Sequence, residues 1–239
     1  WMDQSAEAPI TAILEDVTVT NSSYVGIYNR DSTVIGTRLR VENGPYGVVS
    51  FGEASLISLN TIEVEDSYSI ESTDAVTAEV SRIAGIGIWG MQGSNTHITH
   101  GRFVNNEYAN IWFSDEETHG ELHNVASDES TGTPQGNGGF GILVEAGAYV
   151  EMDTVAAKGN FAHGILVTGE GSLVEVDNLD IKGTKGIKGN SEDGDMLSIQ
   201  GVAIKGGAEF TGSKGLIEEA GMYGVYVDGV GSKGSFDNY

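Results

Sequence analysis

Acidic side chains are the most abundant residues here that could do chemistry. Of 239 residues, 35 are Asp or Glu and 12 are Lys or Arg. Within residues 189–195, Glu192, Asp193 and Asp195 offer the carboxylate oxygens that Ca²⁺ prefers. The segment lacks the spaced Asp-x-Asp-x-Asp-Gly pattern of a calcium loop, so a Ca²⁺ site and a plain acidic turn both stay open. We expect no other cofactor.

Histidine offers a second possible metal chemistry. His97 and His119 are 22 residues apart, which is close to the repeat described below, and Glu121 follows nearby. If the two rings stack in one register, they could share a transition metal with that carboxylate. Because three dependable ligands are not evident, ordinary surface histidines are the alternative reading. His163 falls within a repeated phrase and is read as an outer or turn residue.

Composition restricts the classes of partner. The net charge is −23. A surface with this charge repels nucleic acid and anionic lipid, and it suits cations or a cationic partner. No apolar run approaches about 18 residues, so we expect no membrane insertion in this segment. The chain has no cysteine, which excludes disulfides and thiolate chemistry.

A repeated phrase identifies the elements that position these side chains. A small residue before an apolar triplet, here called the anchor, recurs along the chain. The anchors are Gly26, Gly47, Gly87, Asn110, Gly141, Gly164, Met196 and Gly224. The short spacings are close to 22 residues, and the longer ones indicate insertions at Ser67–Arg82, Ser127–Gly138 and Lys182–Asp195. We expect the insertions to project from one side and to offer a binding face, or to be tolerated surface loops.

A second phrase between the anchors alternates apolar and polar residues with period two. Residues 55–62, 148–155 and 172–179 are examples. Such alternation is typical of half-buried strands, and no sustained helical stripe occurs. The sequence therefore predicts an all-β fold, a right-handed parallel β-helix of about eight rungs. It would span residues 12–239, after a lead-in at residues 1–11, as a segment of a longer chain.

These phrases resemble right-handed parallel β-helix proteins of the pectate-lyase-like superfamily. The resemblance rests on the anchors, on Gly194-Asp-Met-Leu-Ser-Ile-Gln and on Tyr223-Gly-Val-Tyr-Val. It is closest to surface repeat proteins of predatory and myxobacterial-type bacteria. The resemblance implies the fold over about residues 12–231 and an extracellular or bacterial cell-surface location. It does not imply one activity, because lyases, hydrolases, adhesins and stalks share this fold.

One column of large side chains is the predicted interaction surface. If the residue after each anchor points inward, the next one points outward. These outward residues are Tyr28, Val49, Trp89, Trp112, Leu143, Leu166, Ser198 and Tyr226. The column predicts self-association or contact with another surface protein, or cover by the inserted loops. A glycan is a further candidate partner, because Trp89 and Trp112 could stack sugar rings, and a column that points inside is the remaining alternative.

Three asparagines lie four residues before an anchor. Asn43, Asn106 and Asn160 are predicted to stack as a ladder of side-chain amides, which is a structural device and not a site.

No catalytic residue is predicted. A lyase of this fold needs an Arg among carboxylates of neighbouring rungs, and a hydrolase needs two carboxylates roughly 5–9.5 Å apart. The motifs of pectinase-type hydrolases are absent. No acid cluster aligns with any arginine; these are Arg30, Arg38, Arg40, Arg82 and Arg102. We therefore expect a non-enzymatic structural or adhesive module, such as a stalk, filament or adhesin. A carbohydrate-active enzyme and a host-recognition module are the alternatives.

Overall fold

Parallel β-strands form the whole regular structure of this chain. The structure is a computed structural model that describes residues 10–69, 85–132, 138–185 and 199–239. Within these ranges every regular element is a strand and no helix occurs. The strands form two sheets, and every pairing in both sheets is parallel.

We call the 10-stranded sheet the long sheet and the 8-stranded sheet the short sheet. The long sheet contains β1 (Thr11–Glu15), β2 (Thr18–Thr20), β4 (Thr33–Glu42), β6 (Leu56–Glu65), β8 (Asn95–Val104), β10 (His119–Asp128), β12 (Tyr149–Lys158), β14 (Leu173–Lys182), β16 (Glu209–Glu218) and β18 (Lys233–Asp237). The short sheet contains β3 (Val25–Arg30), β5 (Tyr46–Phe51), β7 (Ile86–Met91), β9 (Ala109–Ser114), β11 (Phe140–Glu145), β13 (His163–Thr168), β15 (Gln200–Lys205) and β17 (Tyr223–Asp228).

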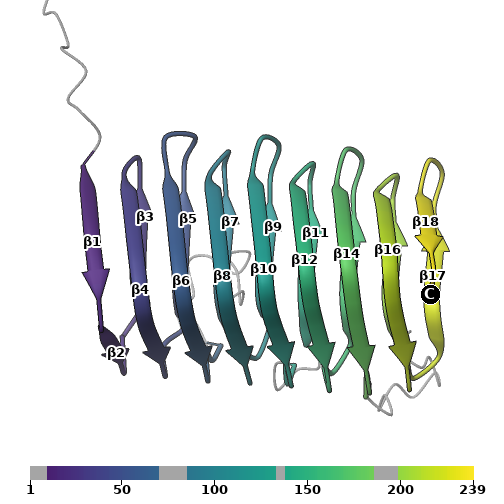
Figure 1. Cartoon of the computed structure of the whole chain (residues 1–239), viewed down its shortest axis with the longest axis horizontal. Helices are drawn as coiled ribbons and strands as arrows, with labels where there is room; N and C mark the ends of the chain where they lie inside the picture. Colours follow the sequence, from purple (N-terminus) through teal and green to yellow (C-terminus); the bar gives the residue numbers. More distant parts are fainter. Residues whose placement is uncertain (1–9, 70–84, 133–137, 186–198) are drawn as a thin grey trace, which may run out of the picture.

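Spatial order follows chain order in both sheets. Each strand pairs with the corresponding strand one turn earlier and one turn later, and Figure 1 shows this progression from purple to yellow. Each rung contains one short and one long strand. The chain is therefore an all-β parallel solenoid of about eight rungs, and the predicted fold class is confirmed. At about 4.8 Å per rung the coil is roughly 40 Å long.

The long strands bend in the middle. Along β6, burial alternates as far as Leu59, then Asn60 and Thr61 both face solvent, and Ile62 returns to the interior. Thr61 has a left-handed backbone with φ of 63°. The equivalent residues of other long strands share this conformation: Arg38, His100, Asn124, Thr154, Asn178 and Lys214. Two consecutive outward residues turn the strand, so the coil bends at the same place on every rung.

Hydroxyl side chains close the turn between the short and long strands. The Ser172 hydroxyl donates to the Thr168 carbonyl at 2.8 Å and accepts from the Gly147 N–H of the preceding rung at 3.0 Å. Ser232 repeats this arrangement with Asp228 and Gly207. Because each hydroxyl satisfies groups on two rungs, the stacked turns are held in register.

Aliphatic residues of both sheets fill the interior of the coil, and glycines make room for its few rings. Phe113 is fully buried. A Cβ added at Gly120 would lie 2.6 Å from the Phe113 ring, and one added at Gly90 would lie 2.7 Å from it. The interior therefore accepts one large ring only where the facing positions carry no side chain.

One predicted anchor is wrong. The register pairs Gln200 with His163 on one side and with Tyr223 on the other, so the anchor of that rung is Gly201 and not Met196. Met196 lies outside the described residues. Gly201 precedes Gly224 by 23 residues, the same spacing as from Gly141 to Gly164. Residues 195–198 resemble the repeat phrase, so the sequence alone assigned the anchor of this rung to the wrong residue.

Two further predictions fall mostly outside the described residues. The lead-in at residues 1–11 is described only at residues 10 and 11. The structure describes the insertion Ser127–Gly138 except for residues 133–137, and of the other two insertions it describes only residues 67–69 and 182–185. Each flank follows the end of a long strand, namely β6, β10 or β14. The insertions therefore leave the coil at one common corner.

Candidate functional site: an aromatic groove beside an acidic corner

The predicted column lies on the outer face of the short sheet. The register aligns Tyr28, Val49, Trp89, Trp112, Leu143, Leu166, Ala203 and Tyr226 in that order. Trp112, Leu143, Leu166 and Ala203 belong to a hydrophobic cluster separate from the main core. Ala203 takes the place assigned from the sequence to Ser198, because the anchor of that rung is Gly201.

A kink at each anchor adds a second outward column that the sequence reading missed. A Cβ added at Gly47 would lie 2.3 Å from the interior side chain of Val64, and the next residue, Val48, is also fully buried. Two consecutive inward residues leave both flanking residues on the outer face. The residues before the anchors therefore line up beside the first column: Val25, Tyr46, Ile86, Ala109, Phe140, His163, Gln200 and Tyr223.

Aromatic rings on this face form a continuous run. The Trp89 and Trp112 rings stack with centroids 4.7 Å apart and planes 10° apart. The other successive centroid distances are 5.4 Å for Tyr24–Tyr46, 6.0 Å for Tyr46–Trp89, 5.3 Å for Trp112–Tyr108, 5.7 Å for Tyr108–Phe140 and 5.6 Å for Phe140–His163. Such stacked and edge-on pairs stabilise the face beyond the area they bury.

Burial divides the column into a covered middle and exposed ends. Trp112, Leu143 and Leu166 are 4%, 2% and 9% exposed. Tyr28 at the amino-terminal end is 53% exposed. The middle of the predicted surface is therefore not accessible, and the exposed aromatic surface lies at the ends of the short sheet.

An apolar groove of about 600 Å³ occupies the amino-terminal end of this face. It is lined by Ser22, Ser23, Tyr24, Val25, Tyr28, Tyr46, Val49, Phe51, Trp89 and Met91. The Trp89 indole N–H donates to the Ser114 hydroxyl at 3.1 Å, which holds the ring in place. Burial raises the pKa of Tyr46 to about 12, so this phenol is neutral at physiological pH.

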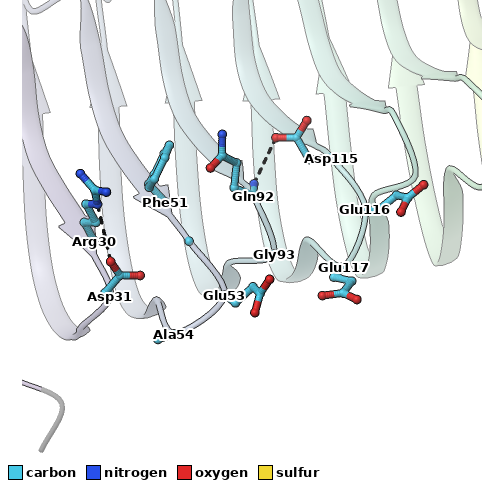
Figure 2. Close-up of a pocket in the computed structure, with 11 residues that line it drawn as sticks. Arg30, Asp31, Phe51, Glu53, Ala54, Gln92, Gly93, Asp115, Glu116 and Glu117 are labelled. Carbon is cyan, nitrogen blue, oxygen red and sulfur yellow. Dashed lines mark hydrogen bonds and ion pairs between the residues drawn. The ribbon is translucent and has the colours of Figure 1, made fainter. Parts of the chain in front are cut away.

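An acidic corner lies at the carboxyl ends of the same strands (Figure 2). This hollow of about 670 Å³ is lined by Arg30, Asp31, Phe51, Gly52, Glu53, Ala54, Gln92, Gly93, Asp115, Glu116 and Glu117. Its lining contains five carboxylates and one guanidinium. The Gln92 N–H donates to Asp115 Oδ2 at 3.1 Å. Because Phe51 lines both hollows, the groove and the corner adjoin.

The arginines do have acidic neighbours, contrary to the sequence reading. Arg30 Nε lies 3.5 Å from Asp31, in the corner that also holds Glu53 and Asp115. The sequence did not reveal that Glu53 and Asp115 share this corner with Arg30, because residues of stacked turns lie far apart in the chain. Arg82 lies outside the described residues.

Arg38, Arg40 and Arg102 also pair with acids, on the outer face of the long sheet. Arg38 pairs with Asp16 at 2.5 Å and with Glu15 at 2.7 Å, and its guanidinium lowers the pKa of Asp16. Arg40 contacts Glu42, Glu63 and Glu65, and Arg102 contacts Glu63 at 2.5 Å. These exposed pairs connect neighbouring rungs.

The structure brings together two of the three ladder asparagines. Asn106 and Asn160 are fully buried, and Asn110, an anchor residue, joins them. The Asn106 amide donates to Asn110 Oδ1 at 2.8 Å, and the Asn110 amide lies 3.4 Å from Asn160 Oδ1. The Ser130 N–H donates to Asn160 Oδ1 at 3.0 Å, and the Asn160 amide donates to the Ser127 carbonyl at 2.9 Å.

Asn43 does not join this network. It is exposed and left-handed, with φ of 53°, like Asn105 with φ of 56°. Both residues follow the end of a long strand and donate their N–H to the end of the next one. The turn before Gly47 is one residue shorter than the turn before Asn110. Counting back from the anchors therefore matched Asn43 with Asn106, whereas in the structure it corresponds to Asn105.

Four histidines lie on the outer face of the long sheet. His97 is paired in register with Glu121, and His119 with Tyr149, so the two histidines do not share a register position. The His97 Nδ1 atom lies 2.7 Å from Glu121 Oε2, and the His119 ring stacks on Tyr149 at 5.0 Å. No group of three potential metal ligands occurs in the described part of the chain. The Ca²⁺ candidates Glu192, Asp193 and Asp195 lie outside it.

His163 is on the outer face of the short sheet, as expected, but it is buried. It is 5% exposed, stacks on Phe140, and its Nδ1 accepts the Gln200 N–H at 3.3 Å. Burial, with a smaller contribution from Lys205, lowers the pKa of His163 to about 4. The ring is therefore neutral at physiological pH and serves as a packing group.

This burial predicts acid sensitivity. Unfolded histidine takes up a proton near pH 6.5, whereas folded His163 does so only near pH 4. The free energy of unfolding should therefore fall by about 3 kcal/mol as pH drops from 6.5 to 4. His163→Gln, which copies Gln200 of the next rung, should remove most of this slope in urea unfolding at pH 7, 5.5 and 4. The exposed His123→Gln is the control and should keep it. An unchanged slope in His163→Gln would contradict the assignment.

No family model, curated protein or solved structure matches the chain. Among the described residues, no helix is long and apolar enough to cross a membrane.

Proposed function

We propose that this chain is a non-enzymatic structural or adhesive module of an extracellular or bacterial cell-surface protein, such as a stalk, filament or adhesin. The observation that carries the proposal is the regular coil of parallel strands, in which each described rung stacks on the next. Such a coil is extended by adding rungs, from the same chain or from another copy.

The carboxyl-terminal rung exposes interior positions clearly. Val225 and Val227 are 38% and 46% exposed. They are paired in register with Val202 and Ile204, which are fully buried one rung earlier. In the described residues the outer edge of β17 is also unpaired. A further rung, of a longer chain or of a second copy, would cover both the side chains and the edge.

The charge of the outer faces supports a rod that does not aggregate sideways. Several cations pair with acids of the adjacent rung, as do Lys182 with Glu218 at 3.2 Å and Lys214 with Asp177 at 3.3 Å. The chain carries 35 acidic and 12 basic residues, so its net charge is strongly negative. Rods of this kind repel one another laterally, whereas the exposed apolar side chains Val225 and Val227 of the last rung can meet a further rung.

An end-blocking substitution tests the proposal. We expect the purified chain to form rods longer than one module in negative-stain electron microscopy and to sediment as oligomers. Val227→Glu should abolish these species, because a carboxylate at an interior position opposes stacking. Val230→Glu, at a fully exposed turn residue, is the matched control and should leave assembly intact. Monomeric rods in all three proteins would contradict end-to-end assembly. Loss of rods on chelation would assign a role to the acidic insertion.

A carbohydrate-active β-helix enzyme is the second candidate, favoured by Arg30 among the carboxylates of the acidic corner. The arginine could bind the carboxylate of a uronate, and one of the neighbouring carboxylates could act as the base. Turnover of uronic-acid polymers that is lost in Asp115→Asn, but not in Asp153→Asn on the other sheet, would favour this candidate over the structural one.

A further inference from the structure

We propose that the aromatic groove and the acidic corner form one docking surface for a basic amphipathic peptide segment of a partner protein. The segment would carry Lys or Arg next to Val, Leu or aromatic side chains. This inference rests on the adhesive role proposed above and names the class of partner.

The groove provides the apolar half of the surface. Tyr24 and Tyr28 are 63% and 53% exposed, and together with the Trp89 ring, which Ser114 holds in place, they line a hollow of about 600 Å³. Exposed aromatic side chains gathered in a hollow are typical of protein interaction sites. A hollow of this size holds a few side chains of an extended segment.

The corner provides the charged half. Its carboxylates belong to the turns after β3, β5 and β9, and Figure 2 shows Asp31, Glu53 and Glu117 on these three turns. Only Arg30 opposes the five acids. The corner is therefore a concentrated negative patch immediately beside apolar surface, and a peptide that crosses from one to the other needs both apolar and cationic side chains.

The junction already shows the type of contact that the partner would make. The Arg30 guanidinium lies over the Phe51 ring, 5.1 Å from its centroid. Phe51 borders both hollows. A cation over an aromatic face next to carboxylates is stabilised by both the ring and the acids. Lysine or arginine of a partner would find the same surroundings along β5 and β7.

A basic peptide fits this surface better than a sugar chain. Sugar binding needs polar groups that accept and donate to hydroxyls, but the Trp89 N–H is bonded to Ser114 and the Ser22 hydroxyl donates to the Val25 carbonyl at 2.7 Å. The net charge of −23 attracts cations over long range, gives no gain to neutral sugars and repels acidic ones.

Fluorescence anisotropy with defined probes tests the proposal. The probe is a fluorescein-labelled peptide of three Lys-Leu-Lys-Val repeats. Comparison peptides replace Lys by Glu, or Leu and Val by Ser, and a neutral glucose hexasaccharide is added as competitor. We expect the basic apolar peptide to bind, the Glu peptide not to bind, and the Ser peptide to bind about tenfold more weakly because the groove stays empty. Displacement by the hexasaccharide, or equal binding of the Ser peptide, would overturn the proposal.

Substitutions locate the binding. Tyr28→Ala should weaken binding about tenfold, and Glu53→Gln with Glu117→Gln should weaken it about fivefold and reduce its dependence on salt. Tyr226→Ala, in the same column at the far end, and Glu209→Gln, on the long sheet, are matched controls and should bind like the unaltered chain. All five side chains are at least partly exposed, so folding should be preserved. Equal affinity across all variants would overturn the proposal.

The same variants separate this inference from the proposed function. Tyr28→Ala and the Glu53/Glu117 variant should still form rods, whereas Val227→Glu should still bind the peptide. Rods without peptide binding would refute the docking surface alone, and peptide binding without rods would refute end-to-end assembly alone.

Discussion

Phe113→Ala is expected to lower the free energy of unfolding by about 4 kcal/mol. The ring is fully buried in the interior of the coil. Facing positions carry glycines, namely Gly90 and Gly120, so no neighbouring side chain is available to fill the space that the ring leaves. The cost should therefore include the cavity as well as the lost burial.

A double-mutant cycle makes this prediction specific. Gly120→Ala alone should cost about 2 kcal/mol, because its Cβ would lie 2.6 Å from the Phe113 ring. In the Phe113→Ala background the same substitution should be neutral or stabilising, since the new methyl group enters the cavity. Urea unfolding followed by circular dichroism of the four proteins gives the coupling, expected at about 2 kcal/mol. Additive effects would show that the ring and the glycine do not share one space.

Asn160→Leu is expected to cost a similar amount, about 4 kcal/mol. The Asn160 side chain accepts the Ser130 N–H and hydroxyl at 3.0 and 2.9 Å and donates to the Ser127 carbonyl at 2.9 Å. Leucine has nearly the same volume but leaves these buried groups without partners. The loss should appear in urea unfolding, and tryptophan fluorescence would report whether the native fold is kept.

Asn43→Ala is the matched control for this substitution. Asn43 was grouped with Asn160 from the sequence, but it is exposed and left-handed in the structure. Asn43→Ala should lower the free energy of unfolding by only about 1 kcal/mol, because alanine tolerates the left-handed backbone conformation less well than asparagine. Similar costs at both positions would contradict the distinction between a buried amide network and a turn.

Most of the repeat was predictable, because a rung must present the same inward residues each time. The spacing of Gly141 and Gly164, and the period-two phrases after them, indicated parallel strands stacked turn on turn. The prediction was wrong where the chain departs from the period. Met196 belongs to a predicted insertion whose sequence resembles the repeat phrase. The turn that contains Asn43 is one residue shorter than the turn before Asn110.

The candidate site was only half predictable. The column from Tyr28 to Tyr226 followed from alternation, and its outward direction is as expected. The second column with Tyr46 and Phe140 was missed, because alternation breaks at the anchor, where two consecutive residues face the core. Gly47 gave the signal: a residue without a side chain marks close packing against Val64.

The sequence by itself determined the all-β class, the parallel stacking of about eight rungs and the position of the aromatic column, because these depend on periodicity within one chain segment. Only the tertiary structure decided which members of the column are buried, that Arg30 lies among carboxylates, and that His97 is paired in register with Glu121 and not with His119. The physical reason is register. A strand repeats its own pattern locally, but which residues of different rungs meet depends on the length of every turn and insertion between them.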